Sequence, residues 1–198
     1  MSAPLTPPPA EIFKAYDIRG IVGKTLTEDG VRQIGRALGS EARERGQKSI
    51  AIGRDGRLSG PSLAAALAEG ICAAGVDVVD IGMVATPMSY FAAHHLGTGS
   101  AVSVTGSHNP PEYNGLKMVL GGTTLSGEDI QRLRQRIEKG DLASGQGKLT
   151  HADVRAAYLG RILGDVKLTR PVRIAVDCGN GVAGATAAEL FRRMGCEI

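Results

Sequence analysis

The sequence lacks the features of several large classes of protein. It has no tryptophan, only three cysteines, and a net charge of +3 over 198 residues. Because the charges are also scattered along the chain, we expect neither nucleic acid nor an anionic membrane as a partner. Cys72, Cys178 and Cys196 are far apart and form no C-x-x-C pair. We therefore predict reduced thiols in a cytoplasmic protein, without a disulfide framework or a zinc site.

Long apolar runs are also missing. No stretch approaches the roughly 18 apolar residues that a membrane-spanning helix needs. The first residues show no basic segment followed by an apolar one, so the sequence predicts no signal peptide. Pro4, Pro7, Pro8 and Pro9 stand there instead, and we expect residues 1–10 to form a flexible leader.

What is present is the composition of an ordinary globular protein, with 42% hydrophobic residues. Short apolar runs alternate with segments of helical periodicity, an order typical of a three-layer α/β/α domain with a mixed sheet. We assign residues 11–150 to this domain. The expected strands are 12–22 (interrupted at 17–20), 49–53, 76–81, 101–104 and 115–120. The expected helices are 28–45, 61–74, 86–95 and 126–139. Thr27 and Ser126 are the expected N-caps of the first and the last of these helices.

The sequence pattern of residues 151–198 predicts the beginning of a second domain. The pattern over 151–164 is helical, 172–177 is typical of a strand, and another helix is expected from about residue 184. One β-α unit cannot bury both faces of a parallel strand. We therefore expect a linker helix followed by the incomplete start of a second, similar domain.

A polar loop between two apolar strands concentrates the reactive side chains of the chain. The run 101–104 leads into Thr105-Gly-Ser-His-Asn-Pro110, and the run 115–120 leads away from it. Polar loops that are held by rigid strands commonly carry binding and catalytic groups. The candidate site residues in this stretch are Ser107, His108, Asn109 and Lys117.

The residue types alone leave three roles open for Ser107. A nucleophilic serine needs a base and an orienting acid, and the G-x-S-x-G elbow of hydrolases is absent, so a serine hydrolase gains no support. A serine that carries phosphate needs donors or cations, and the loop amides together with His108, Lys117 and Arg19 could supply them. A purely structural polar turn is the remaining alternative.

Two other polar groups are interpreted as structural. Arg54, Asp55 and Arg57 stand in a glycine-containing turn after a predicted strand, and we expect them to brace that turn. Asn180 stands between two glycines after a later predicted strand, and we expect it to serve turn formation as well.

Five segments of the sequence, taken together, resemble one known family. They are 12–20 (IFKAYDIRG), 53–59 (GRDGRLS), 80–87 (DIGMVATP), 105–117 (TGSHNPPEYNGLK) and 177–184 (DCGNGVAG). In this order they are similar to segments of the α-D-phosphohexomutase superfamily, and the serine loop most resembles that of bacterial phosphomannomutase/phosphoglucomutase. The resemblance is specific because the motifs occur together over nearly the whole chain.

The resemblance implies a hexose-phosphate mutase, which is an intramolecular phosphotransferase and therefore an isomerase. Ser107 would be a phosphoserine that donates its phosphate to a hexose phosphate and later recovers one, with a hexose 1,6-bisphosphate as intermediate. His108 and Lys117 would act in proton transfer or hold the phosphate. Through its phosphate, Ser107 would also be one ligand of a Mg²⁺ ion. The other residues that the resemblance assigns to the site are Arg19, over the phosphoserine, and Tyr16 and Asn109, against the substrate.

The sequence departs from the family pattern in what it lacks. The D-G-D-x-D-R motif that supplies the family's other metal ligands is absent, as are the segments that select the sugar and clamp its phosphate. We therefore expect the 198 residues alone to be inactive as a mutase and to depend on the remaining domains of the same polypeptide, which would also select between mannose and glucose phosphates. A non-catalytic module that binds phosphate or a sugar phosphate is the alternative, because a fold alone does not define a function.

Overall fold

Apolar side chains on successive strand residues divide between two faces of one sheet. In β2 (Ser49–Arg54), Ile50 and Ile52 lie in one hydrophobic core and Ala51 lies in another. The residues of β4 (Ala101–Val104) alternate in the same way. Because neighbouring residues of a strand point to opposite faces, both faces of this sheet are buried and both need a covering layer.

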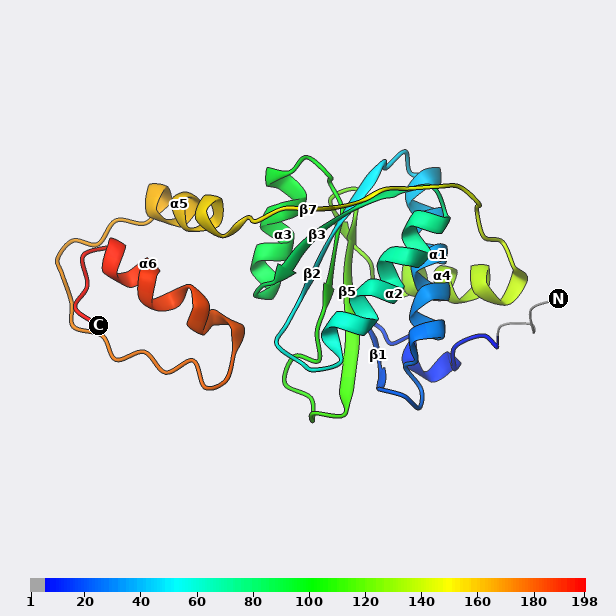
Figure 1. Ribbon diagram of the computed structural model, residues 1–198, viewed down its shortest axis with the longest axis horizontal. Helices are drawn as coiled ribbons and strands as arrows, with labels where there is room; N and C mark the ends of the chain where they lie inside the picture. Colours follow the sequence, from blue (N-terminus) through cyan, green and yellow to red (C-terminus); the bar gives the residue numbers. More distant parts are fainter. Residues whose placement is uncertain (1–5) are drawn as a thin grey trace.

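The structure is a computed structural model that describes residues 6–198, and it contains one mixed sheet of seven strands (Figure 1). The strands besides β2 and β4 are β1 (Ile18–Ile21), β3 (Asp77–Met83), β5 (Tyr113–Leu120), β6 (Thr123–Thr124) and β7 (Leu149–His151). Their order is β1-β5-β4-β2-β3-β7, with β6 paired to β5. From β4 to β7 the strands are parallel, whereas β5 runs antiparallel to β4 and β1.

Helices cover both faces of this sheet (Figure 1). α1 (Glu28–Glu44), α2 (Gly60–Ala73) and α4 (Glu128–Lys139) lie on one face, where their apolar residues form the larger core. α3 (Thr86–His95) lies on the other face and packs on β2 and β4. The predicted three-layer α/β/α fold with a mixed sheet is therefore confirmed.

α1 and α2 lie close together because glycines stand where they touch. A Cβ on Gly70 of α2 would lie 2.1 Å from the carbonyl oxygen of Arg32 in α1. One on Gly35 of α1 would lie 2.4 Å from the carbonyl oxygen of Leu67 in α2. The two backbones thus approach more closely than residues with side chains allow. This contact holds α2 against α1, and the amino end of α2 borders the candidate site.

The first strand and one helix cap differ from the sequence prediction. The strand lies at Ile18–Ile21, largely within the expected interruption, because Ile18 is fully buried and the segment pairs residue for residue with β5. α4 is preceded by Gly127 at the cap position, not by Ser126. Gly127 has a φ of 48°, a backbone conformation that glycine adopts without steric cost.

The region after residue 148 departs further from the prediction. Residues 149–151 form β7 on the edge of the sheet, so the linker helix, α5, spans Arg155–Asp165 and does not start at residue 151. Residues 172–177, all within the described part of the chain, form no strand and have a single bridge from Arg173 to Glu197. A strand needs a neighbouring strand for its backbone groups, and the backbone of this segment bonds to Glu197 alone at this bridge, through Val172 and Ile174. α6 (Ala187–Arg193) follows.

Residues 1–5 of the expected leader lie outside the described residues. Within residues 6–10, Pro8 is buried, and the Thr6 carbonyl accepts a hydrogen bond from the side-chain amide of Gln33 in α1. Residues 6–10 therefore lie against α1. Over residues 6–198, no helix combines the length and the apolar character that crossing a membrane requires.

Candidate active site

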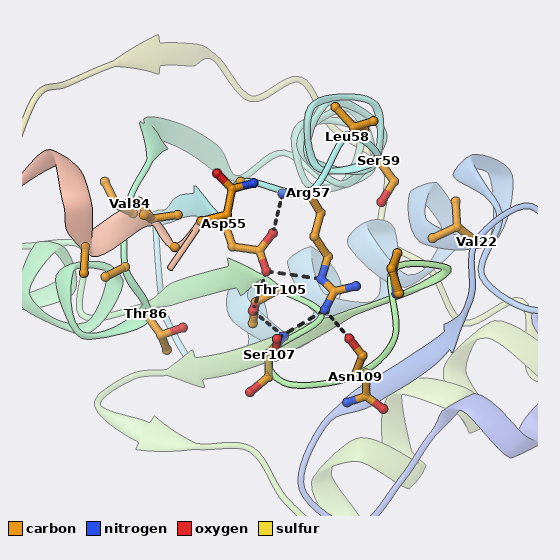
Figure 2. Close-up of a pocket in the computed structure, with 17 residues that line it drawn as sticks. Val22, Asp55, Arg57, Leu58, Ser59, Val84, Thr86, Thr105, Ser107 and Asn109 are labelled. Carbon is orange, nitrogen blue, oxygen red and sulfur yellow. Dashed lines mark hydrogen bonds and ion pairs between the residues drawn. The ribbon is translucent and has the colours of Figure 1, made fainter. Parts of the chain in front are cut away.

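The candidate site lies where the parallel strands end. A cavity of about 840 Å³ opens there between the β2–α2 turn, the start of α3 and the β4–β5 loop (Figure 2). Asp55, Arg57 and Ser59 line it from the turn, and Ser107 lines it from the loop. The carboxyl ends of parallel strands are where open α/β sheets bind ligands. The fold thus brings the serine loop to a favoured position for a binding site.

Ser107 has an unusual backbone conformation. Its φ is +51°, and it is the only non-glycine residue with a positive φ among residues 6–198. This left-handed conformation costs an L-residue about 1 kcal/mol. The Ser107 amide donates a hydrogen bond to Thr105 Oγ1 at 2.9 Å, while the Ser107 hydroxyl lies 3.3 Å from His108 Nδ1. Because Ser107 is exposed and lines the cavity, a ligand in the cavity can reach its hydroxyl.

Asp55 joins the β2–α2 turn to the serine loop. Its Oδ2 atom accepts hydrogen bonds from Thr105 Oγ1 at 2.8 Å and from the Gly106 amide at 3.0 Å. Its Oδ1 atom accepts a third from the Arg57 amide at 3.0 Å. The Asp55 carboxylate therefore braces the loop as well as its own turn (Figure 2).

Arg57 reaches the same loop with its guanidinium group. Nη1 donates to the carbonyl oxygens of Pro110 at 2.6 Å and Tyr113 at 2.9 Å. Nη2 donates to those of Asn109 at 2.6 Å and Ser107 at 3.2 Å. Sequence reasoning assigned Arg57 only to its own turn and missed this contact. The sequence did contain a signal for it, because Asp55 and Arg57 flank Gly56 shortly after a predicted strand.

Arg19 approaches the loop from β1. Arg19 pairs with Gly115 of β5, and its Nη1 atom donates to the Gly106 carbonyl oxygen at 2.5 Å. Its Nη2 atom pairs with the Asp17 carboxylate, also at 2.5 Å. The Arg19 side chain is only 10% exposed. The Arg19 guanidinium group thus contacts the loop backbone at Gly106, the residue that directly precedes Ser107.

His108 and Asn109 continue the loop after Ser107. His108 is exposed, and Asn109 lines the cavity. The backbone amide and the side-chain amide of Asn109 both donate to the Gly106 carbonyl oxygen, at 3.0 and 3.2 Å. With Arg19, three donors converge on this one carbonyl oxygen, which stabilises the turn on which Ser107 stands.

Lys117 and Tyr16 lie outside the described lining of the cavity. Lys117 is half-buried in β5, opposite Ser103 of β4. Because Leu116 and Met118 point into the larger core, Lys117 points to the opposite face of the sheet, which α3 covers. Tyr16 is 80% exposed, so its ring is accessible to a ligand. The catalytic role of Lys117 and the substrate contact of Tyr16 stay predictions.

The electrostatic surroundings of the cavity favour a negative charge. Ser59 and Thr86, at the amino ends of α2 and α3, both line it. Neither helix has a side-chain hydrogen bond that caps this end. Pro61 and Pro87 carry no N–H, and the amides of Gly60 and Met88 donate to carbonyl oxygens, so these ends act on a ligand mainly through the positive end of the helix dipole, which favours anions. The cavity can therefore accept an anionic ligand such as a phosphate group.

A segment that is distant in sequence closes part of the cavity. Residues 180–183 line it together with Ser107. A Cβ built on Gly56 of the β2–α2 turn would lie 3.8 Å from Val182 Cγ2. Asn180 does stand in a turn, closed by the bond from the Gly181 amide to the Cys178 carbonyl oxygen at 2.9 Å, but its place beside the cavity had no signal in the local sequence.

The described residues do not form a complete metal site. No three His, Cys, Asp or Glu side chains among residues 6–198 lie close enough together to hold an ion. Asp55 is the only carboxylate that lines the cavity in this part of the chain, and its oxygens already accept three hydrogen bonds. Mg²⁺ requires near-octahedral oxygen ligands. A group on Ser107 would be at most one of them, so the described residues alone do not fit this ion.

Comparisons with known proteins agree with the fold and the site. Residues 10–144 match the family model described as phosphoglucomutase/phosphomannomutase, alpha/beta/alpha domain I. A phosphomannomutase/phosphoglucomutase of Pseudomonas aeruginosa is 52% identical over 190 residues, which cover 96% of this chain and 41% of that protein. A phosphoglucomutase of Neisseria gonorrhoeae is 54% identical over 190 residues, which cover 95% of this chain and 41% of that protein.

Solved structures show the same relationship. The crystal structure of a phosphoglucomutase/phosphomannomutase family protein from Burkholderia thailandensis superposes with a TM-score of 0.89 at 55% identity, covering 94% of this chain and 42% of that one. A putative phosphomannomutase from Thermus thermophilus has a TM-score of 0.75 at 26% identity, covering 100% of this chain and 45% of that one.

The fold and the site define a class of protein: an α/β/α domain that presents a serine on a loop at the carboxyl ends of parallel strands. With the match over residues 10–144, the chain belongs to the phosphoglucomutase/phosphomannomutase family and contains its domain I. The chain spans about two fifths of the length of the curated relatives that it matches, 41% in both cases given above.

Proposed function

We propose that this chain is the phosphoryl-carrying part of a phosphohexomutase that interconverts hexose 1-phosphates and hexose 6-phosphates. One observation carries the proposal: the Ser107 hydroxyl lies beside the cavity on a loop that Asp55, Arg57 and Arg19 hold in a left-handed turn. The cavity favours an anion, and relatives at 52% and 54% identity are named as mutases. A non-catalytic binding module on this fold is therefore not favoured.

The proposed reaction consists of two phosphoryl transfers through Ser107. In the first, the bond between Ser107 Oγ and phosphorus breaks, and a bond forms between phosphorus and the free hydroxyl oxygen of the hexose monophosphate. The hydroxyl proton passes to a base, and the serine oxygen takes up a proton. In the second transfer the other phosphate of the hexose 1,6-bisphosphate returns to Ser107. Phosphate and protons balance, so the net change is an isomerisation.

The side chains around Ser107 have proposed roles in these steps. His108 would exchange a proton with the serine oxygen, which the 3.3 Å distance between His108 Nδ1 and Ser107 Oγ supports. Lys117 would assist in proton transfer or hold the phosphate, and Arg19 would lie over the phosphoserine. Tyr16 and Asn109 would contact the sugar.

The proposal includes partners beyond the described residues. Mg²⁺ would offset the charge of the phosphate when bound, with a phosphate on Ser107 as the one ligand from this chain and the other ligands from the remaining domains of the same polypeptide. Hexose 1,6-bisphosphate would be both intermediate and activator, and mannose and glucose phosphates are the proposed substrates. We propose a cytoplasmic location, because Cys72, Cys178 and Cys196 are free thiols.

Mass spectrometry and a coupled assay test the function together. This chain would be joined to the remaining length of the Pseudomonas aeruginosa relative and incubated with glucose 1,6-bisphosphate. We expect an addition of about 80 Da, the mass of one phosphoryl group, on Ser107. We also expect a loss of turnover of about 1,000-fold or more in Ser107→Ala, since the variant has no phosphate acceptor.

Ser62→Ala is the matched control, because Ser62 is exposed in the first turn of α2 and does not line the described cavity. It should keep normal turnover. Normal turnover by Ser107→Ala would refute the carrier role. Normal turnover by the 198 residues alone would refute the dependence on further domains, and exchange of those domains between relatives tests their selection of the sugar.

A further inference from the structure

We infer that Arg57 is a positioning residue that sets the direction of the Ser107 hydroxyl, an inference that rests on the proposed function of Ser107. Its guanidinium group donates four hydrogen bonds to main-chain carbonyl oxygens, and all four acceptors lie within residues 107–113. One of them is the carbonyl oxygen of Ser107 itself. Among residues 107–113, these four carbonyl oxygens are therefore held by one side chain that comes from another strand–helix turn.

The hydrogen-bonding capacity of Arg57 is used up by these contacts. The two terminal nitrogens of a guanidinium group carry four N–H bonds, and each terminal nitrogen here has two carbonyl partners. The remaining nitrogen, Nε, lies 3.6 Å from Asp55 Oδ2. The Arg57 side chain is 16% exposed. Although Arg57 lines the cavity, it therefore has no free terminal donor for a substrate phosphate.

Asp55 holds the other side of the same turn. Arg57 fixes the carbonyl oxygens from Ser107 onward, whereas Asp55 fixes the Thr105 hydroxyl and the Gly106 amide just before it. Ser107 stands at the junction of these two sets of contacts. A left-handed backbone in a residue other than glycine persists only where the surroundings determine it, and this pair of contacts supplies such surroundings.

Gly106 provides the space that this arrangement needs. A Cβ on Gly106 would lie 1.9 Å from Arg57 Nε and 2.0 Å from Arg57 Cζ. The guanidinium group thus lies against the backbone of the residue that precedes Ser107. A lysine at position 57 has a single ammonium group on a flexible stem and cannot present a planar fork to four carbonyl oxygens. Arg57→Lys therefore removes the positioning contacts while it keeps the charge.

Hydrogen–deuterium exchange of the 198-residue chain tests the positioning directly. In Arg57→Lys we expect the amides of residues 105–113 to exchange about 10-fold faster or more, while those of β2 and β4 keep their wild-type rates. Arg54→Lys is the matched control, since Arg54 stands three residues earlier, at the end of β2, and does not line the described cavity. Wild-type exchange over residues 105–113 in Arg57→Lys would overturn the inference.

Chemical rescue separates a positioning role from a general loss of stability. In Arg57→Ala of the joined polypeptide, we expect kcat to fall about 10- to 100-fold with KM within about 3-fold of wild type, because a misdirected nucleophile affects the transfer and not the binding of the sugar. Guanidinium chloride at about 20 mM should restore part of kcat, and an equal concentration of sodium chloride should not. A raised KM with unchanged kcat would make Arg57 a substrate ligand and overturn the inference.

The two measurements fail independently. In one case Ser107 never gains phosphate, but the amides of residues 105–113 still exchange faster in Arg57→Lys. The carrier function is then refuted, and so is the catalytic part of the inference, because Arg57 holds only the backbone of an unphosphorylated loop. If Ser107 gains phosphate normally and the loop exchanges normally in Arg57→Lys, the proposed function stands and the role of Arg57 is refuted.

Discussion

Residues 6–154 and 155–198 contain similar sequence patterns but differ greatly in packing. In the first region, strands and helices bury residues such as Leu67 completely. In the second, α5 has one buried residue, Leu159, and α6 has none. The strand-like run 172–177 remains partly exposed. An apolar β-α unit thus acquires a core only where neighbouring strands and helices meet it.

The largest expected contrast between the two regions is the effect of adding one methyl group to a helical glycine. In Gly70→Ala the new Cβ would lie 2.1 Å from the Arg32 carbonyl oxygen, so α1 and α2 must separate, and we expect a loss of about 3 kcal/mol or more. In Gly160→Ala of α5 nothing lies within 4 Å of the new Cβ. Alanine should there stabilise the helix by up to about 1 kcal/mol.

Urea unfolding of both glycine variants measures these free energies. The matched pair distinguishes helix propensity, which is the same at both sites, from packing, which is present only at Gly70. Equal effects of the two substitutions would show that the close approach of α1 and α2 does not exist in solution.

A smaller contrast concerns ion pairs. Arg136 of α4 is 12% exposed and pairs with Glu41 of α1 at 3.1 Å, whereas Arg161 of α5 is 68% exposed and pairs with Asp165 at 3.0 Å. Arg136→Ala leaves a buried carboxylate short of a partner, so we expect a loss of about 1–3 kcal/mol. Arg161→Ala should cost less than about 0.5 kcal/mol, because solvent screens that pair.

Thermal and urea unfolding at low and high salt check this contrast. The effect of Arg136→Ala should persist at high salt, since the pair is shielded from solvent. An Arg136→Ala variant as stable as wild type would mean that α1 and α4 are held by their apolar contacts alone.

The smallest expected effect is a pH dependence that arises at the same α1–α4 contact. Burial acts to raise the pKa of Asp129, but hydrogen bonds and charges from Arg45 and Arg132 outweigh it and lower the pKa below its ordinary 3.8. The folded protein therefore holds this proton less tightly than the unfolded chain. The resulting stabilisation is present above the ordinary pKa and is lost as the pH falls through the lowered value.

Asp129→Asn isolates this contribution. The difference in unfolding free energy between wild type and Asp129→Asn should be largest near neutral pH and should shrink as the pH falls below about 4. Asp165→Asn in α5 is the control for removing a carboxylate from an exposed helix surface, because the Asp165 side chain is 54% exposed. A difference that grows towards low pH would contradict the assigned direction of the Asp129 pKa.

Local signals predicted much of the fold. Thr27 caps α1 through a hydrogen bond from the Gly30 amide, as its position before the helix indicated. α3 occupies 86–95 as predicted, and β4 and β5 flank the serine loop. The predictions that were wrong concern segments whose structure depends on pairing with a neighbouring strand. β7 exists because β3 offers it an edge, and 172–177 forms no strand because it has no such edge.

The candidate site was predictable only in part for the same reason. Ser107, His108 and Asn109 are neighbours in sequence, so their proximity required no tertiary structure. Asp55 and Arg57 were visible as a charged turn, but their hydrogen-bond partners in the serine loop lie 50 to 56 residues further along the chain. Hydrogen bonds over such separations depend on which strands are neighbours, and composition and spacing do not specify that.

The sequence by itself determined the layered α/β class, the serine loop and the family, because periodicity and contiguous motifs are local properties. Only the tertiary structure decided that Arg57 and Asp55 hold Ser107 in a left-handed turn, that Arg19 contacts the same loop from β1, and that residues 180–183 line the cavity. These contacts form when β2 and β4 pair in parallel and bring their carboxyl ends together. The order of the strands thus brings motifs that are far apart in the sequence together in one site.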